Sequence, residues 1–157
     1  MKGMINMIQS YINAVTPLTS NNAGVQFQAD CIRTRSCDCN GWLCHNKGSA
    51  NYDITEGGLY EVNFNATVSA ATAGVVAFAL FNNGEQIPGT LMAETLAAAD
   101  DFVNIGINKK IKICCRGNST ISVRSVPAVP TATAPATPIE TQIPIIVNAN
   151  LSISRIS

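Results

Sequence analysis

The chain has 157 residues, of which 46% are hydrophobic, enough for one domain with a sizeable core. Only 13% are charged, and ten basic side chains balance ten acidic ones, which leaves no basic stripe to bind nucleic acid. The longest weakly polar run, residues 70–81, is far too short to insert across a membrane. A low share of charged residues is typical of a protein whose surface is partly covered by other copies or by partners.

The N-terminal residues carry an apolar pattern with helical spacing. Six apolar side chains recur at intervals of one turn: Met4, Ile5, Ile8, Tyr11, Ile12 and Val15. Pro17 ends the pattern, so we predict a short helix within an N-terminal anchor segment, residues 1–20. The segment lacks a convincing secretory cleavage site, and we therefore expect folding in a cytoplasm, where thiols stay reduced.

Beyond Pro17, short alternating segments and turn residues predict β-strands. Residues 59–70 alternate most clearly, with Tyr60, Val62 and Phe64 on one face. Asn83-Gly84 predicts a hairpin turn after a strand that begins at residue 74. Further strands are predicted at residues 24–34, 102–107, 111–115, 119–126 and 141–157.

These strands follow one another without intervening helices, which predicts an all-β sandwich or jelly roll over residues 21–157. Residues 127–141 are rich in proline, threonine and alanine, and cannot form a central strand or a helix. We expect them to form an exposed loop, with a proline-rich recognition motif as the alternative.

Residues 35–48 concentrate three cysteines with the only tryptophan and the only histidine. Cys37, Cys39, Cys44 and His45 could ligate a metal, but their spacing is not that of usual zinc sites. A disulfide staple is a second interpretation. Reduced thiols, some buried and some in a loop, are the one we favour, and we expect no metal or cofactor.

Enzymatic chemistry has little support in the sequence. Cys44 and His45 are neighbours, and adjacent residues on a strand point to opposite faces, so they make a poor nucleophile–base pair. Neither a glycine-rich phosphate cradle nor a nucleophile elbow is visible. We therefore expect a protein that is not an enzyme.

Several short motifs occur in an order that resembles a known group of domains. They are Gly48-Ser49, Ile54-Thr55, Gly58-Leu59-Tyr60, Leu80, Asn83-Gly84, Ile87-Pro88-Gly89, Glu94-Thr95, Cys114-Cys115 and residues 151–156. Residues 20–157 resemble the jelly-roll domains related to tumour necrosis factor and the complement heads. They look most similar to the form found in head-fibre or capsid-decoration proteins of tailed bacteriophages. Collagen-like spore-surface proteins carry a similar domain, but this chain has no Gly-X-Y repeats to build their stalk.

The resemblance implies a homotrimer that decorates the exterior of a phage virion after synthesis in the host cytoplasm. Its implied partners are its own copies, the major capsid protein, and in some settings a host-surface glycan. The first twenty residues would then dock on the shell. A bacterial cell- or spore-surface protein and a phage tail receptor-binding module are the alternatives. Six residues are expected to line the core or the trimer contact: Tyr60, Phe64, Phe78, Phe81, Leu151 and Ile153.

Overall fold

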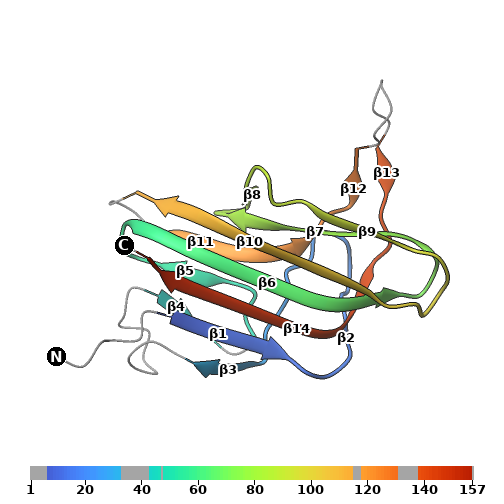
Figure 1. Cartoon of the computed structure of the whole chain (residues 1–157), viewed down its shortest axis with the longest axis horizontal. Coiled ribbons are helices and arrows are strands. Elements are labelled where there is room, and N and C mark those ends of the chain that lie inside the picture. Colours follow the sequence, from blue (N-terminus) through green and yellow to red (C-terminus); the bar gives the residue numbers. More distant parts are fainter. Residues whose placement is uncertain (1–6, 33–42, 47, 115–117, 131–137, 157) are drawn as a thin grey trace.

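Two antiparallel sheets packed face to face make up most of the chain in the computed structural model, which describes residues 7–32, 43–46, 48–114, 118–130 and 138–156 (Figure 1). The front sheet contains, in spatial order, β10 (Val103–Ile113), β6 (Gly58–Ala70), β14 (Pro144–Arg155), β1 (Met7–Ile12) and β3 (Ala29–Ile32), with β2 (Thr16–Pro17) beside β14. The back sheet contains β4 (Leu43–His45), β5 (Tyr52–Ile54), β11 (Ser119–Ser125), β7 (Gly74–Asn82) and β8 (Glu85–Gln86), with β9 (Met92–Leu96) paired to β7.

The described residues contain no helix, which confirms the predicted all-β sandwich. Accordingly, no described segment is a helix with the length and apolar character that a bilayer crossing requires. The turn at Asn83 and Gly84 has φ values of 53° and 83°, the left-handed geometry expected of an Asn-Gly hairpin turn.

The predicted N-terminal helix is wrong: residues 7–12 form strand β1. This strand pairs with β14 along its whole length, and Ile8 and Ile12 are 2% and 3% exposed in the core. The alternating series Ile8, Ser10 and Ile12 faces inward, which is a two-residue period. Isoleucine favours strands, and the free edge of β14 supplies the hydrogen bonds that decide between the two patterns.

The interior between the sheets follows the alternation seen in the sequence. Strand β6 points Tyr60, Val62 and Phe64 into the core, and the Phe64 ring contacts Phe27 and Phe78 at centroid distances of 6.3 and 6.1 Å. Phe27 lies outside any strand, because only the last part of the predicted strand 24–34 forms a ladder, as β3.

Strand β10 runs continuously through Lys109 and Lys110, which lie between the two strands predicted at residues 102–107 and 111–115. These lysines pair with Val62 and Glu61 of β6, and a lysine on an edge strand can direct its ammonium group to water while the ladder continues. The two predicted strands are therefore one.

Strand β7 is buried on both faces, unlike the other long strands. Val76, Phe78 and Leu80 face the main core, while Ala77, Ala79 and Phe81 face the outside of the back sheet. Val126 and Val129 cover that outer face and form a second apolar cluster with it.

These covering residues belong to an arm, residues 126–142, that includes the short hairpin β12 (Ala128–Val129) and β13 (Ile139–Glu140). The hairpin projects beyond the sandwich (Figure 1), while backbone hydrogen bonds join its base to β7, from Val126 N to Ala77 O and from Gln142 N to Val75 O. The proline-rich segment was predicted to be an exposed loop, but its base is a packed part of the fold.

Candidate functional site

The outer face of the front sheet contains a group of uncharged polar side chains, which we call the amide face. It follows from strand alternation, because the neighbouring residues on each strand point into the core. Its members come from β1, β6, β10 and β14, and are Gln9, Tyr11, Asn63, Asn65, Thr67, Asn104, Asn108, Asn150 and Ser152.

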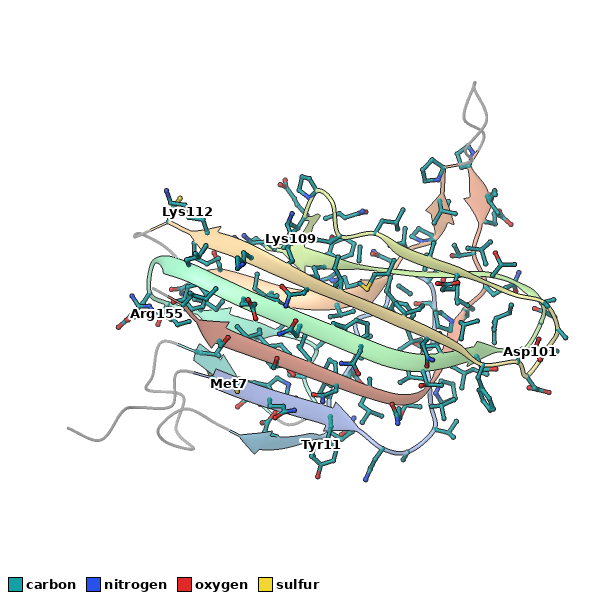
Figure 2. The ribbon with its side chains drawn as sticks, in the orientation of Figure 1. Met7, Tyr11, Asp101, Lys109, Lys112 and Arg155 are labelled. Atoms are coloured by element: carbon teal, nitrogen blue, oxygen red, sulfur yellow. The ribbon has the colours of Figure 1, made fainter. Side chains whose placement is uncertain are left out.

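The register aligns these side chains in rows across the sheet. Asn65 lies opposite Asn150 of β14 on one side and Gly106 of β10 on the other, and Tyr11 lies opposite Asn150. The charged residues of these four strands are Glu61 on β6, Lys109, Lys110 and Lys112 on β10, and Arg155 at the end of β14; Figure 2 labels Lys109, Lys112 and Arg155. The rows at Asn63, Asn65 and Thr67 contain no charged side chain.

Hydrogen bonds between side chains order the amide face. The Thr67 hydroxyl donates to Asn104 Oδ1 at 2.9 Å, and Gln9 Nε2 donates to Asn150 Oδ1 at 3.3 Å. Asn108 donates to the Asn63 side-chain oxygen, which lies directly opposite it. Because these amides already bond one another, covering them costs less free energy than covering charged side chains.

The six residues expected at the core or the trimer contact are all buried within the single chain. Five of them, Tyr60, Phe64, Phe78, Leu151 and Ile153, lie in the main core. Phe81 lies instead in the cluster under the arm, where the Arg124 guanidinium stands 5.5 Å from its ring centre. The five side chains in the main core hold the sheets together, so a contact with another copy has to use their outward-facing neighbours.

The six proposed anchor residues do not share one surface. Ile8 and Ile12 are in the core, Tyr11 belongs to the amide face and Val15 is 66% exposed after β1. Met4 and Ile5 lie outside the described residues. Removal of residues 1–20 would therefore delete β1 from the sheet, and would not simply detach an anchor.

The chemically richest cluster lies between the two sheets and was not predicted. Asp30 on β3 and His45 on β4 have fully buried side chains, with His45 Nδ1 2.8 Å from Asp30 Oδ1. The Ser10 hydroxyl of β1 donates to the same carboxylate oxygen, and the His45 ring stacks on Tyr52 of β5 at 4.1 Å. A substrate has no access to these fully buried groups, so the cluster contributes to structure.

The proposed metal ligands are occupied or undescribed. Cys44 is disulfide-bonded, so our preference for reduced thiols is wrong at this position. Both ring nitrogens of His45 are within hydrogen-bond distance of protein oxygens, and Cys37 and Cys39 lie outside the described residues. Among the residues described, no group of three or more histidine, cysteine or acidic side chains is arranged to hold a metal ion. Cys114, at the end of β10, is an exposed free thiol.

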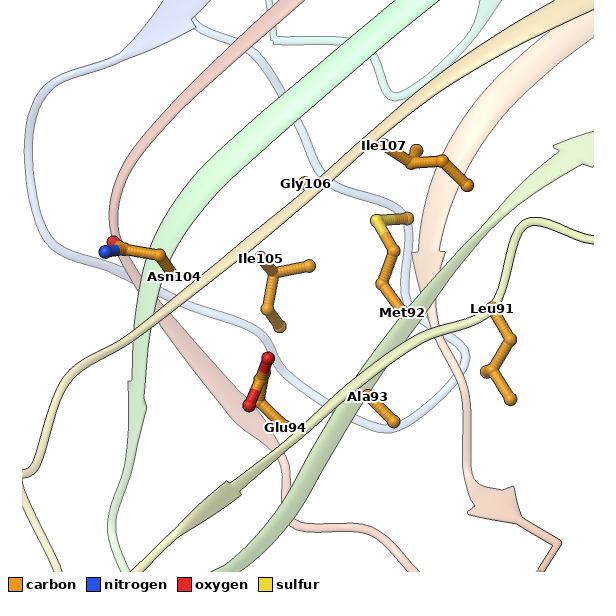
Figure 3. A pocket seen from close by; sticks show the side chains of 8 residues that line it. All are labelled: Leu91, Met92, Ala93, Glu94, Asn104, Ile105, Gly106 and Ile107. Carbon is orange, nitrogen blue, oxygen red and sulfur yellow. The ribbon is translucent and has the colours of Figure 1, made fainter.

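A shallow groove of about 250 Å³ opens where β9 and β10 face each other at the edge of the sandwich (Figure 3). Glu94 and Asn104 supply its polar groups, beside the apolar Met92 and Ile105. Glu94 is its only carboxylate, and the lining contains no base or nucleophile to pair with it.

No family model matches the chain, and no curated protein matches its sequence. Similarity appears at the level of structure. The globular domain of a zebrafish complement 1qA protein matches with a TM-score of 0.62 at 7% identity, over 98% of each chain. This chain has the TNF/C1q-like jelly-roll fold. Murine APRIL matches this jelly roll with a TM-score of 0.54 at 11% identity, covering 96% of this chain and 99% of that one. The Eiger TNF from S. frugiperda matches with a TM-score of 0.55 at 8% identity, covering 97% of this chain and 94% of that one.

The sequence reasoning for this jelly roll found the core aromatic residues but missed both polar features. The amide face was detectable, because residues 63–67 place asparagine or threonine at every second position between core residues. The Asp30–His45 pair had no local signal, because its partners lie on different strands of different sheets.

Proposed function

We propose that this protein is a homotrimeric structural and binding protein without enzymatic activity, and that the amide face is the surface through which its copies associate. The observation that carries the proposal is the hydrogen-bonded amide face, whose rows at Asn63, Asn65 and Thr67 contain no charged side chain. Proteins with this fold are typically homotrimers, which supports self-association. Charged residues are depleted at the centre of protein interfaces, and the amide face has the same character.

The charge placement on β10 supports this proposal. Lys110 lies opposite Glu61 near the end of the amide face, and Lys112 lies one pleat further along. Lysine on an edge strand discourages unspecific strand addition, which leaves the amide face as the surface for ordered contact.

The mass of the protein in solution tests the association. We expect wild type at about three times the chain mass of 16.6 kDa. Asn65→Lys places a charge at the centre of the amide face and should yield the single-chain mass. Gln86→Lys adds the same charge at an exposed position on the back sheet and should stay trimeric. A wild type at the single-chain mass would overturn the proposal, and a trimeric Asn65→Lys would exclude this face.

We further propose, on the sequence resemblance, that the trimer decorates the exterior of a phage capsid. Three weak contacts per trimer, made together, would give strong attachment to a symmetric shell. Co-sedimentation with purified phage shells tests this location. We expect the trimer to sediment with shells and the Asn65→Lys monomer to remain in solution. A trimer that ignores shells would favour a cell- or spore-surface protein or a tail receptor-binding module.

A further inference from the structure

If three copies associate through the amide face, as proposed above, symmetry limits how they can meet. A closed ring of three copies is built from heterologous contacts, so each copy must offer a different surface to each of its two neighbours. The two sides of the front sheet are different surfaces, because β1 lies toward one side and β10 is the edge strand at the other. The contact between copies therefore joins the β1 side of one copy to the β10 side of the next.

One row of the front sheet carries complementary features at these two sides. The row runs from Tyr11 on β1 through Asn150 and Asn65 to Gly106 on β10. At one side it presents the partly exposed ring of Tyr11 (labelled in Figure 2), and at the other it lacks a side chain at Gly106. A rotation axis along the strands would bring both to the same level, so that the ring of one copy faces the gap in the next.

The gap at Gly106 adjoins the groove between β9 and β10. Gly106 is one of the residues that line this groove, and Asn104 belongs both to the groove and to the amide face. Met92, Glu94 and Ile105 point into the space between the two strands (Figure 3). Met92 and Ile105 are buried and form an apolar floor, whereas Glu94 is exposed. The groove is therefore continuous with the amide face, and it offers an apolar floor with one carboxylate beside it.

A tyrosine side chain matches both parts of this groove. Its ring is a rigid apolar surface, and its phenol group can donate a hydrogen bond to the Glu94 carboxylate, which only accepts. Within the described part of the chain, neither the Tyr11 hydroxyl nor the Glu94 carboxylate forms a hydrogen bond or an ion pair. A cavity of about 150 Å³ can hold benzene, so the groove, at about 250 Å³, has room for the ring.

We propose that Tyr11 of one copy inserts into the groove between β9 and β10 of the next copy, where its hydroxyl donates to Glu94. This contact depends on the trimer proposed above, and it specifies which side chain and which site join the copies. Glycine at position 106 leaves the approach to the groove open, as glycine within a strand does where another chain comes close. Each copy gives one tyrosine and receives one, so the ring closes with equal contacts.

Sedimentation over a range of concentrations tests the contact with variants at its two ends. Tyr11→Ala should raise the concentration at which half of the copies are trimeric by at least about tenfold, as the loss of a buried aromatic anchor does. Tyr11→Phe and Glu94→Ala should each have a smaller effect. Their combination should be no weaker than the weaker single variant, because both remove the same hydrogen bond. Glu85→Ala, the matched change at an exposed position on β8, should leave association unchanged.

These variants avoid Gly106 because an added Cβ there would lie 3.3 Å from the carbonyl oxygen of Phe64 and would disturb the strand itself. If Tyr11→Ala does not fold, Tyr11→Phe and Glu94→Ala still decide, since each changes an exposed or partly exposed side chain. Additive effects of these two changes would overturn the hydrogen bond between them.

A photo-crosslinker locates the ring directly. With a benzophenone-bearing phenylalanine in place of Tyr11, we expect links to residues 91–94 or 104–107 of another copy. Mass spectrometry of mixed light and heavy copies separates links between copies from links within one. Links only to other segments, or an unchanged trimer in Tyr11→Ala, would overturn the Tyr11 contact and leave the proposed trimer standing. A wild type at the single-chain mass would overturn both.

Discussion

The two sheets of this protein treat their outer faces in different ways. The outer surface of the back sheet is apolar on β7. The arm of the same chain covers it with Val126 and Val129. The front sheet has a polar outer surface, uncharged at the rows of Asn63, Asn65 and Thr67, and no described segment of the same chain covers it. An apolar sheet face needs a cover within the folding unit, whereas a hydrogen-bonded amide face is stable in water and can also be buried later by another copy.

The largest effect should come from the core that both sheets share. Phe64→Ala removes a ring that is 1% exposed and packs against Phe27 and Phe78. We expect a loss of about 3–5 kcal/mol in the free energy of unfolding, measured by chemical denaturation. Phe102→Ala is the matched control, because that ring is 66% exposed and should cost under about 0.5 kcal/mol. Equal losses for the two variants would contradict this description of the core.

The cover over the back sheet should give a smaller effect. Phe81→Ala removes the largest side chain of the second cluster and the ring under Arg124. Because the arm can collapse partly into the space, we expect a loss of about 2 kcal/mol and faster amide exchange at residues 126–130. Exchange in β6 should not change. Uniform acceleration over both sheets would show that the arm is not a separate unit.

A single hydrogen bond at the base of the arm should matter less. The buried Thr141 hydroxyl donates to the carbonyl oxygen of Val126. Thr141→Val keeps the shape but leaves that carbonyl without this donor, and we expect a loss of about 1–2 kcal/mol in denaturation experiments. Thr95→Val, at an exposed position on β9, serves as the control. If Thr141→Val leaves the free energy of unfolding unchanged, water replaces the hydroxyl and the base of the arm is open.

The smallest effect on the single chain should come from the amide face. Asn65→Ala removes an exposed side chain, and we expect the free energy of unfolding of the monomer to change by less than about 0.5 kcal/mol. The same change should weaken association, visible as a shift of the monomer–trimer equilibrium with concentration in sedimentation. A large loss of monomer stability would mean that the face contributes to folding as the back face does, and the contrast between the two faces would disappear.

The strands with strict alternation of apolar and polar residues, and the hairpin turn at Asn83-Gly84, could be predicted from the sequence. Tyr60, Val62 and Phe64 defined the core face of β6, because a period of two leaves one choice of face. Asn83-Gly84 specified its hairpin, since few other residue pairs adopt two successive left-handed conformations. These features depend on residues close together in the chain, so local reasoning was sufficient.

The tertiary structure decided everything that depends on distant partners. Ile8 and Ile12 fit a helix or a strand equally well by spacing, and only the free edge of β14 made them a strand. Val126 and Thr141 became buried because β7 offered an apolar outer face to a segment whose composition is that of a loop. Asp30 and His45 met because each lies on the last strand of its sheet, at the same edge of the sandwich. Sequence alone thus determined which side chains share a face, while packing determined which faces meet.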